Sequence, residues 1–189
     1  MLIVFLDANV LYPQTVRDVL LSGAEADLFA IRWSAQVLDE AQRNLESWGA
    51  GLAPPIPAAV FTHTFALMTG AFPEAMVDGY EALIDAQTCN PKDRHVLAAA
   101  THAGADVLVT DNIRDFPTSS WPAGLRAETA DVFLAAEATE RSEAYRAVIA
   151  AIAGRNRRAP ADSVPGLVGL LRTTLPRLAV IVGGPLPNR

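Results

Sequence analysis

The chain has 189 residues, a formal net charge of -6 at pH 7 and 51% hydrophobic residues. This length suits one domain with a modest extension, and it is long enough to bury a full hydrophobic core. The negative charge argues against a broad basic surface that binds nucleic acid through phosphate contacts alone. It does not exclude a nuclease, because a carboxylate cluster that binds divalent cations reverses the local charge.

A single cysteine, Cys89, rules out an intrachain disulfide, which suits a reducing cytoplasm. The apolar run over residues 1–6 is too short to span a membrane, and it lacks the basic region and cleavage site of a signal peptide. We therefore expect a cytoplasmic protein without a membrane partner. The mean hydropathy of +0.22 is high for a soluble monomer, and it fits either an apolar partner surface or an alanine-rich helical protein.

The chain begins with a predicted buried strand. Residues 2–6 are continuously apolar and end at Asp7, a pattern typical of a parallel strand inside a sheet. Tyr12 and Pro13 mark a turn, and a helical pattern follows over residues 15–29.

Ser34 has the character of a helix N-cap. The residues just before it, 31–33, fit either a strand end or a loop. Apolar residues at helical spacing follow the cap: Val37, Leu38, Ala41 and Leu45. A Gly/Pro-rich break is predicted over residues 49–57, and another helix over residues 58–68. Residues 73–86 fit a short helix and a connection.

The clearest helix start lies at residues 90–93. Asn90 can cap the helix, Pro91 suits its first position, and Asp93 lies in the first turn, where the helix dipole favours negative charge. Gly104 is predicted to end this helix. Residues 106–110 then predict a second buried strand, and the order strand, helix, strand predicts a right-handed βαβ unit.

The C-terminal third is predicted to be mainly helical. A loop (117–122) and an edge strand (125–127) precede a long helical stretch (131–153), a basic linker (154–165) with Arg155, Arg157 and Arg158, and a last helix (166–175). Residues 178–182 are apolar, and residues 183–185 are expected to end the ordered chain. We expect a main domain over residues 1–138 and a helical extension over residues 139–189.

Acidic residues fall where a sheet of this kind binds ligands. Asp7 and Asp111 follow the carboxyl ends of the two buried strands, and ligands of open α/β sheets bind at that edge. Asp93 lies in the first turn of the helix between them, and Glu40 lies about two turns into the helix capped by Ser34. Each acid alone also fits a cap, a turn or a solvated helix face, so the prediction depends on the constellation.

A carboxylate at the end of a buried strand is costly unless it is paired or ligated. The sequence shows no strong set of buried basic partners, although Arg17, Arg32 and Arg94 are candidates. A divalent cation is the alternative partner. Oxygen ligands alone favour Mg²⁺ or Mn²⁺ over zinc, and the three histidines and one cysteine have no zinc-site spacing.

In order and spacing, four segments resemble PIN-domain ribonucleases, most closely the bacterial branch that includes VapC-type toxins. They are Leu6–Leu11, Trp33–Glu40, Pro91–Ala100 and Val109–Phe116, and the resemblance covers roughly residues 2–134. It implies a three-layer α/β/α fold with a central, mostly parallel sheet, here with a C-terminal helical extension. It also implies Mg²⁺- or Mn²⁺-dependent hydrolysis of phosphodiester bonds, usually in RNA.

Carried over residue by residue, the resemblance assigns metal-binding and catalytic roles to Asp7, Glu40 and Asp93. It assigns supporting roles to Asn9, Ser34 and Thr110. Three further residues are predicted to contact the substrate: Arg17, at a basic position often present in this branch, and Arg94 and His95, which can reach a phosphate.

The chain departs from the family pattern at the fourth acid. That pattern has an aspartate two residues after the threonine, where this chain has Asn112. Asp111 is our first choice for the missing carboxylate, followed by Asp115, with Asn112 as a neutral oxygen ligand. One charge fewer would weaken a second metal, so a one-metal resting state is a further hypothesis.

We therefore predict a metal-dependent endoribonuclease that is the toxin of a toxin–antitoxin pair, with an antitoxin partner and a homodimeric state. The altered fourth acid leaves the alternative of a weak or inactive protein that kept the fold for binding. A phosphatase with an aspartyl nucleophile is disfavoured, because Asn9 replaces the second acid of the usual Asp-x-Asp pair. The region after about Thr139 fits a dimer arm, an antitoxin-like segment or a lid.

Overall fold

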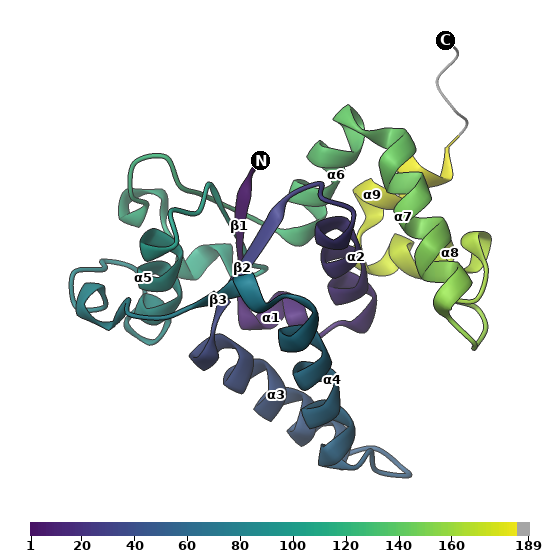
Figure 1. Cartoon of the computed structure of the whole chain (residues 1–189), viewed down its shortest axis with the longest axis horizontal. Coiled ribbons are helices and arrows are strands. Elements are labelled where there is room, and N and C mark those ends of the chain that lie inside the picture. The colour runs from purple at the N-terminus through teal and green to yellow at the C-terminus, as the bar shows by residue number, and fades with distance from the viewer. Residues whose placement is uncertain (185–189) are drawn as a thin grey trace. The chain divides into compact units, whose positions relative to one another are not determined.

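The computed structural model describes residues 1–184 of the chain. Contacts between residues divide it into two compact units, which we describe separately (Figure 1). The sheet unit comprises Met1–Tyr12 and Phe29–Glu128, and the helical unit comprises Pro13–Leu28 and the chain from Thr129 onward. The predicted boundary after residue 138 falls inside a helix of the helical unit, Ala130–Glu140.

A parallel sheet forms the centre of the sheet unit. Its strands are β1 (Ile3–Leu6), β2 (Ala30–Ser34), β3 (Met76–Val77), β4 (Val107–Val109) and β5 (Arg126–Glu128). Within the described residues they form a five-stranded sheet in the order β3-β2-β1-β4-β5, and every pair is parallel. β4 and most of β1 are fully buried, as their apolar sequences predict. The predicted α/β class with a central parallel sheet is therefore confirmed.

Short strands are where the sequence was least informative. Residues 31–33, left open between strand and loop, belong to β2. β3 was not predicted, because it is only two residues long and lies between the 3₁₀ turns Pro73–Ala75 and Glu81–Leu83. β5 confirms the predicted edge strand with a shift of one residue.

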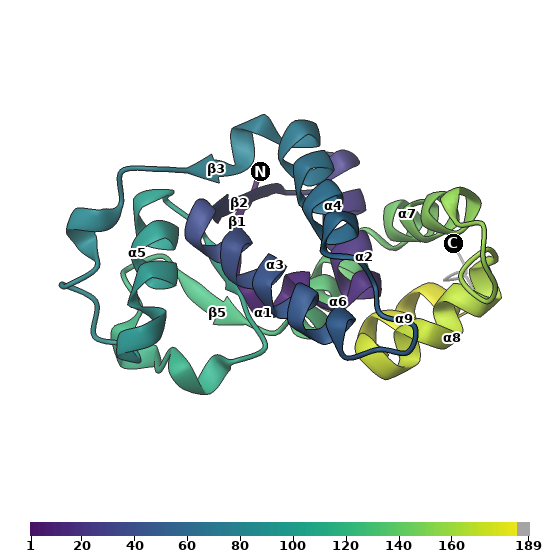
Figure 2. The same cartoon turned by 90° about the horizontal axis from the view of Figure 1, so that it is seen from below.

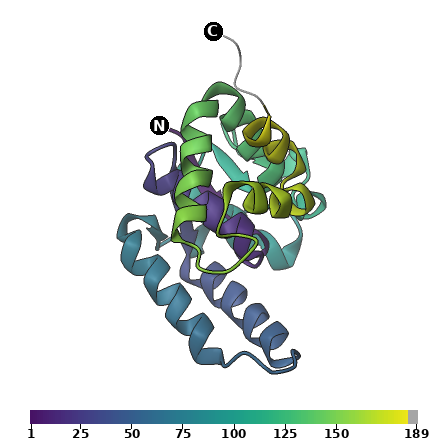
Figure 3. The same ribbon diagram turned by 90° about the vertical axis from the view of Figure 1, so that its right-hand side faces the viewer.

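Helices in the sheet unit flank this sheet. They are α1 (Ala8–Leu11), α3 (Ala35–Ala50), α4 (Ala58–Ala71) and α5 (Arg94–His102). The Oγ of Ser34 accepts a hydrogen bond from the Val37 backbone N at 3.3 Å, which confirms the predicted cap of α3. Both α3 and α5 contact β2, and α3 runs alongside α4 up to the loop that joins them (Figures 2 and 3).

The start of α5 is tighter than predicted. The Asn90 side chain accepts a hydrogen bond from Lys92 N at 3.3 Å, as expected of a cap. A 3₁₀ turn, Pro91–Asp93, follows it, and α5 proper begins only at Arg94. At the other end, Gly104 has a φ of 62°, a left-handed conformation that confirms its predicted role in ending the helix.

The helical unit corrects three predictions. Its helices are α2 (Gln14–Glu25), α6 (Ala130–Glu140), α7 (Ser142–Arg155), α8 (Val164–Thr174) and α9 (Pro176–Gly183). The helix predicted over 15–29 ends early, where Asp27 adopts a φ of 55°. The stretch 131–153 is two helices that separate at Arg141, which leaves helical geometry (φ -133°, ψ 47°). The apolar residues 178–182 belong to α9, which was not predicted.

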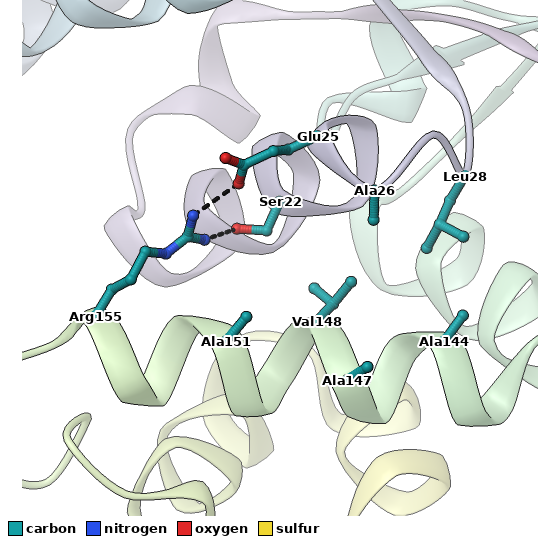
Figure 4. A pocket seen from close by; sticks show the side chains of 9 residues that line it. All are labelled: Ser22, Glu25, Ala26, Leu28, Ala144, Ala147, Val148, Ala151 and Arg155. Carbon is teal, nitrogen blue, oxygen red and sulfur yellow. Dashed lines mark hydrogen bonds and ion pairs between the residues drawn. The ribbon is translucent and has the colours of Figure 1, made fainter.

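Arg155 is not part of a linker, as the sequence suggested, but the last residue of α7. Its guanidinium donates to Glu25 Oε2 at 2.7 Å and to Ser22 Oγ at 2.6 Å, both on α2 (Figure 4). Residues 183 and 184 lie in and beside the end of α9, and residue 185, also expected to end order, lies outside the described residues. No helix within residues 1–184 is both long and apolar enough to cross a membrane.

Two helical glycines of the sheet unit test how tightly α3 packs on α4. A Cβ added to Gly49 of α3 would lie 2.6 Å from Phe61 Cε2, whereas one added to Gly70 of α4 meets no atom within 4 Å. We expect Gly49→Ala to lower the free energy of unfolding by roughly 1–3 kcal/mol through overpacking. Gly70→Ala should raise it by up to about 1 kcal/mol. Urea denaturation measures both, and a Gly49→Ala protein as stable as the wild type would refute this packing.

Candidate active site

Asp7 is held at the junction of two neighbouring strands. It follows β1 directly, and its backbone N donates to the Val109 carbonyl of β4 at 3.0 Å. Its side chain is the N-cap of α1, with Oδ1 accepting from Ala8 N at 2.7 Å. Only 5% of the residue is exposed. The sequence therefore places this carboxylate where the carboxyl edge of a parallel sheet binds ligands.

The second oxygen of Asp7 is fixed by two predicted supporting residues. Oδ2 accepts from Thr110 Oγ1 at 2.7 Å and from Asn9 Nδ2 at 2.6 Å. Asn9 also accepts from Asp111 N at 2.9 Å, and the Thr110 hydroxyl accepts from Asn112 N at 3.1 Å. The network orients Asp7 and ties the turn after β4 to the turn after β1.

Burial raises the pKa of Asp7 from 3.8 to about 6, even though the hydrogen bonds from Thr110 and Ala8 favour the ionised form. The charges of Glu40 and Asp93 add to the rise. No positive charge is among the main influences on this carboxyl group. Asp7 therefore lies in the field of two other acids, as expected of a site that attracts a cation.

Glu40 extends from α3 and remains 42% exposed. Its Oε1 accepts a hydrogen bond from the Tyr12 hydroxyl at 3.5 Å, and its Oε2 lies 4.0 Å from His95 Nε2. The other ring nitrogen of His95, Nδ1, lies 3.0 Å from the Lys92 carbonyl, which can only accept a hydrogen bond. His95 is buried and faces Glu40, rather than lying on an exposed helix face.

Asp93 lies at the entry to α5 and its Oδ2 is buried without a hydrogen-bond partner. Desolvation raises the pKa of Asp93; Lys92 opposes the rise, and the charges of Asp115 and Glu40 add to it. A buried carboxylate oxygen with no partner is expensive. This orphaned atom is the strongest indication that the acids fit a cation.

Two aspartates in the turn after β4 differ in their relation to the other acids. Asp115 accepts from Asn90 Nδ2 at 2.8 Å and lies 3.8 Å from Lys92 Nζ. It is also among the charges that act most strongly on Asp93. Asp111 is exposed and is not among the strongest influences on Asp7 or Asp93. Asp115 therefore acts electrostatically on Asp93, and which of the two aspartates is the fourth acid stays a prediction.

The carboxylates influence one another's pKa values, but their side chains do not converge on one point. Within residues 1–184, no three Asp, Glu, His or Cys side chains are grouped closely enough to hold a metal ion as they stand. Asp7 and Asp93 are held by the backbone at strand and helix ends, whereas Glu40 is partly exposed on a long side chain. Glu40 is thus the member whose rotamer can change most easily to complete a ligand set.

The other predicted residues fall in different settings. Ser34 is fully buried as the cap of α3, which positions Glu40 indirectly. Arg94 is half-buried, and its Nε is buried without a hydrogen-bond partner. Arg17 lies on α2 and is buried in the helical unit, where desolvation lowers its pKa.

Sequence reasoning missed three residues that line a hollow, one of which, Tyr12, donates to Glu40. Tyr12, Asn44 and Trp48 line a hollow together with Leu45. The available signal was the spacing on α3, because residues 40, 44 and 48 recur every four positions and share one helix face. Tyr12 had been interpreted only as part of a turn.

Comparison with known proteins gives one partial match. Over 76 residues the chain is 42% identical to a Mycobacterium tuberculosis protein named "Putative ribonuclease VapC50". The matched stretch covers 40% of this chain and 45% of that protein, so the chain spans less than half of the relative's length. No family model and no solved structure matches the chain. The similarity supports the resemblance to VapC-type proteins that the sequence motifs predicted.

Proposed function

We propose that the chain is a Mg²⁺- or Mn²⁺-dependent endoribonuclease and the toxin of a toxin–antitoxin pair. The observation that carries this proposal is the group of carboxylates at the sheet edge, above all the buried Asp93 oxygen without a partner. The partial similarity to a protein named as a VapC-type ribonuclease supports the substrate class. An antitoxin partner, a homodimeric state and a cytoplasmic location are further proposals that rest on this resemblance.

In this proposal Asp7, Glu40 and Asp93 hold the cation, and Asp115 adds the fourth charge, with Asp111 or the Asn112 amide as alternatives. Bound metal would supply a water of lowered pKa and stabilise the charge on the phosphate and the leaving oxygen. The donor set consists of carboxylate oxygens, which suits a hard divalent cation.

The surrounding residues prepare these acids for that task. Thr110 and Asn9 orient Asp7 through its Oδ2, and the hydrogen bond from Ala8 N favours its ionised form. Tyr12 directs one oxygen of Glu40, and His95 faces the other. Arg94 is our candidate for a phosphate contact, and Arg17 stays a predicted substrate contact.

Two observations favour a second candidate, a catalytically weak protein that uses the fold for binding. No converged set of three ligands exists within residues 1–184, and Asn112 replaces the usual fourth acid. Metal titration separates the two candidates. Failure to bind Mn²⁺ at millimolar concentration would favour the binding protein.

Removing the carboxylate of Asp7 or of Asp93 should abolish metal-dependent cleavage. We expect Asp7→Asn and Asp93→Asn to lower the rate of Mn²⁺-dependent RNA cleavage by more than about 100-fold, because each removes charge that holds the metal. Asp39→Asn is the control, because Asp39 is an exposed acid on α3, and this variant should cleave at the wild-type rate. Cleavage of a labelled RNA measures all three variants. An Asp7→Asn protein that cleaves at the wild-type rate would contradict the assignment.

Asp115 and Asp111 should differ in their effect on cleavage. Asp115 acts on Asp93 electrostatically, so Asp115→Asn should slow cleavage by about 10-fold or more, whereas Asp111→Asn should have a smaller effect. Steady-state rates at several Mn²⁺ concentrations compare the two. If Asp111→Asn is the more damaging change, the fourth acid is Asp111 after all.

The raised pKa of Asp7 predicts how stability depends on pH without metal. The pKa of Asp7 is about 6 in the folded state and 3.8 in the unfolded state, so the folded state binds this proton more tightly. The stabilisation of the folded state by this proton is complete below about pH 4. It is lost as pH rises through about 6, at a cost of at most about 3 kcal/mol. Divalent metal should offset this loss at pH 7.5, because it binds the ionised acid.

Chemical denaturation between pH 4 and pH 7.5, with EDTA or with Mn²⁺, measures this effect. Asp7→Asn should flatten the pH dependence of the metal-free protein and remove most of the stabilisation by Mn²⁺. A variant with the same pH profile as the wild type would show that Asp7 is not the titrating group.

A further inference from the structure

An aromatic hollow lies next to the acids and takes no part in holding a metal. It has a volume of about 310 Å³ and is lined by Tyr12, Asn44, Leu45 and Trp48, all in the sheet unit. This volume is at the lower end of the range of about 300–1,000 Å³ for small-ligand pockets. Trp48 is 57% exposed, whereas Trp33 is completely buried. The indole of Trp48 is therefore available to contact a ligand in the hollow, whereas that of Trp33 belongs to the core.

Hydrogen bonds connect the hollow to the proposed active site. The Asn44 amide donates to the Tyr12 hydroxyl, which in turn donates to Glu40 Oε1 at 3.5 Å. Burial raises the pKa of Tyr12 to about 12, and the charge of Glu40 adds to the rise. Tyr12 is therefore a neutral phenol at neutral pH that both lines the hollow and donates to the Glu40 carboxylate.

The spacing on α3 sets the distance from the acid to the indole. Glu40, Asn44 and Trp48 lie at successive intervals of four residues on one face of the helix. Each interval advances about 6 Å along the axis, so Trp48 lies about 12 Å from Glu40. A strand whose phosphate reacts beside Glu40 would therefore bring a neighbouring nucleotide to the hollow.

The residues that line the hollow suit a nucleobase better than a phosphate group. None of the four lining residues carries a positive charge, so the hollow offers nothing to neutralise a phosphate. The rings of Trp48 and Tyr12 offer stacking surfaces, and Leu45 offers an apolar surface. The Asn44 amide has a second donor and an acceptor for a base edge besides the bond to Tyr12. Stacking on an aromatic side chain requires an exposed base face, which a paired base does not present.

We propose that this hollow binds an unpaired nucleobase of the RNA substrate, stacked on Trp48, and that it directs cleavage to single-stranded RNA. The inference rests on the proposed function, because it takes the acids as the place of cleavage. Trp48 and Tyr12 are then substrate-binding residues, and Tyr12 is in addition a positioning residue for Glu40.

Binding to a short single-stranded RNA tests the proposal separately from cleavage. The protein carries Asp93→Asn to prevent turnover, and the probes are the single strand, the same strand with abasic positions, and its duplex. In this background, Trp48→Ala should weaken single-strand binding by about 10-fold or more, as expected for the loss of one stacked base. Trp48→Phe should retain most of the affinity, and duplex binding should not change. The abasic strand should bind the parent protein more weakly than the intact strand.

Leu67→Ala is the matched control, because Leu67 is 61% exposed on α4 and outside the hollow. Unchanged single-strand binding in Trp48→Ala would overturn the proposal, as would an equal loss for single strand and duplex or no binding of any RNA. A second copy of this chain as the true occupant would appear as self-association lost in Trp48→Ala, with RNA binding unchanged, and would also overturn it. Absence of cleavage by the wild-type protein, with Trp48-dependent binding intact, would refute the proposed function and the direction of cleavage, but not the binding of a base in the hollow.

Discussion

The hydrogen bonds that hold Asp7 between β1 and β4 are the constraint on which the rest of the site depends. Its carboxylate caps α1 through one oxygen and accepts from Thr110 and Asn9 through the other. The two strands are parallel and adjacent, so their carboxyl ends meet at one edge. Burial there raises the free energy of the ionised form, and a cation is the partner that would lower it. Burial therefore favours the protonated form of Asp7, whereas a bound cation would require the ionised form.

The other acids reach this edge from different elements. Glu40 comes from α3 and Asp93 from the entry to α5, and each raises the pKa of Asp7 through its charge. Within residues 1–184 these acids do not converge into a group of three that could hold a metal ion as they stand. Glu40 connects the cluster to the aromatic hollow through Tyr12, so a single flexible acid links the proposed metal site to the proposed base site.

The sequence predicted features that depend on local chemistry. The strand before Asp7 and the cap at Ser34 follow from runs of apolar residues and from a hydroxyl at a helix start. The sequence did not predict features that depend on contacts between distant residues, such as the two-residue strand β3 and the helix break at Arg141. Asp7 and Glu40 lie on their elements as predicted, whereas Asp93 lies in the 3₁₀ turn before α5 rather than in the first turn of that helix. The sequence ranks Asp111 ahead of Asp115, but it does not show that the charge of Asp115 acts on Asp93 across the turn after β4, and the identity of the fourth acid stays a prediction.

The central claim is that Asp7, Glu40 and Asp93 bind a divalent cation at the carboxyl edge of the sheet. Anomalous diffraction from crystals grown or soaked with Mn²⁺ tests it most directly, because it locates the metal without depending on an activity assay. We predict a strong anomalous peak between these carboxylates, with Glu40 in a rotamer turned toward Asp7. A peak elsewhere, or no peak at millimolar Mn²⁺ in crystals with open solvent access to the site, would contradict the claim.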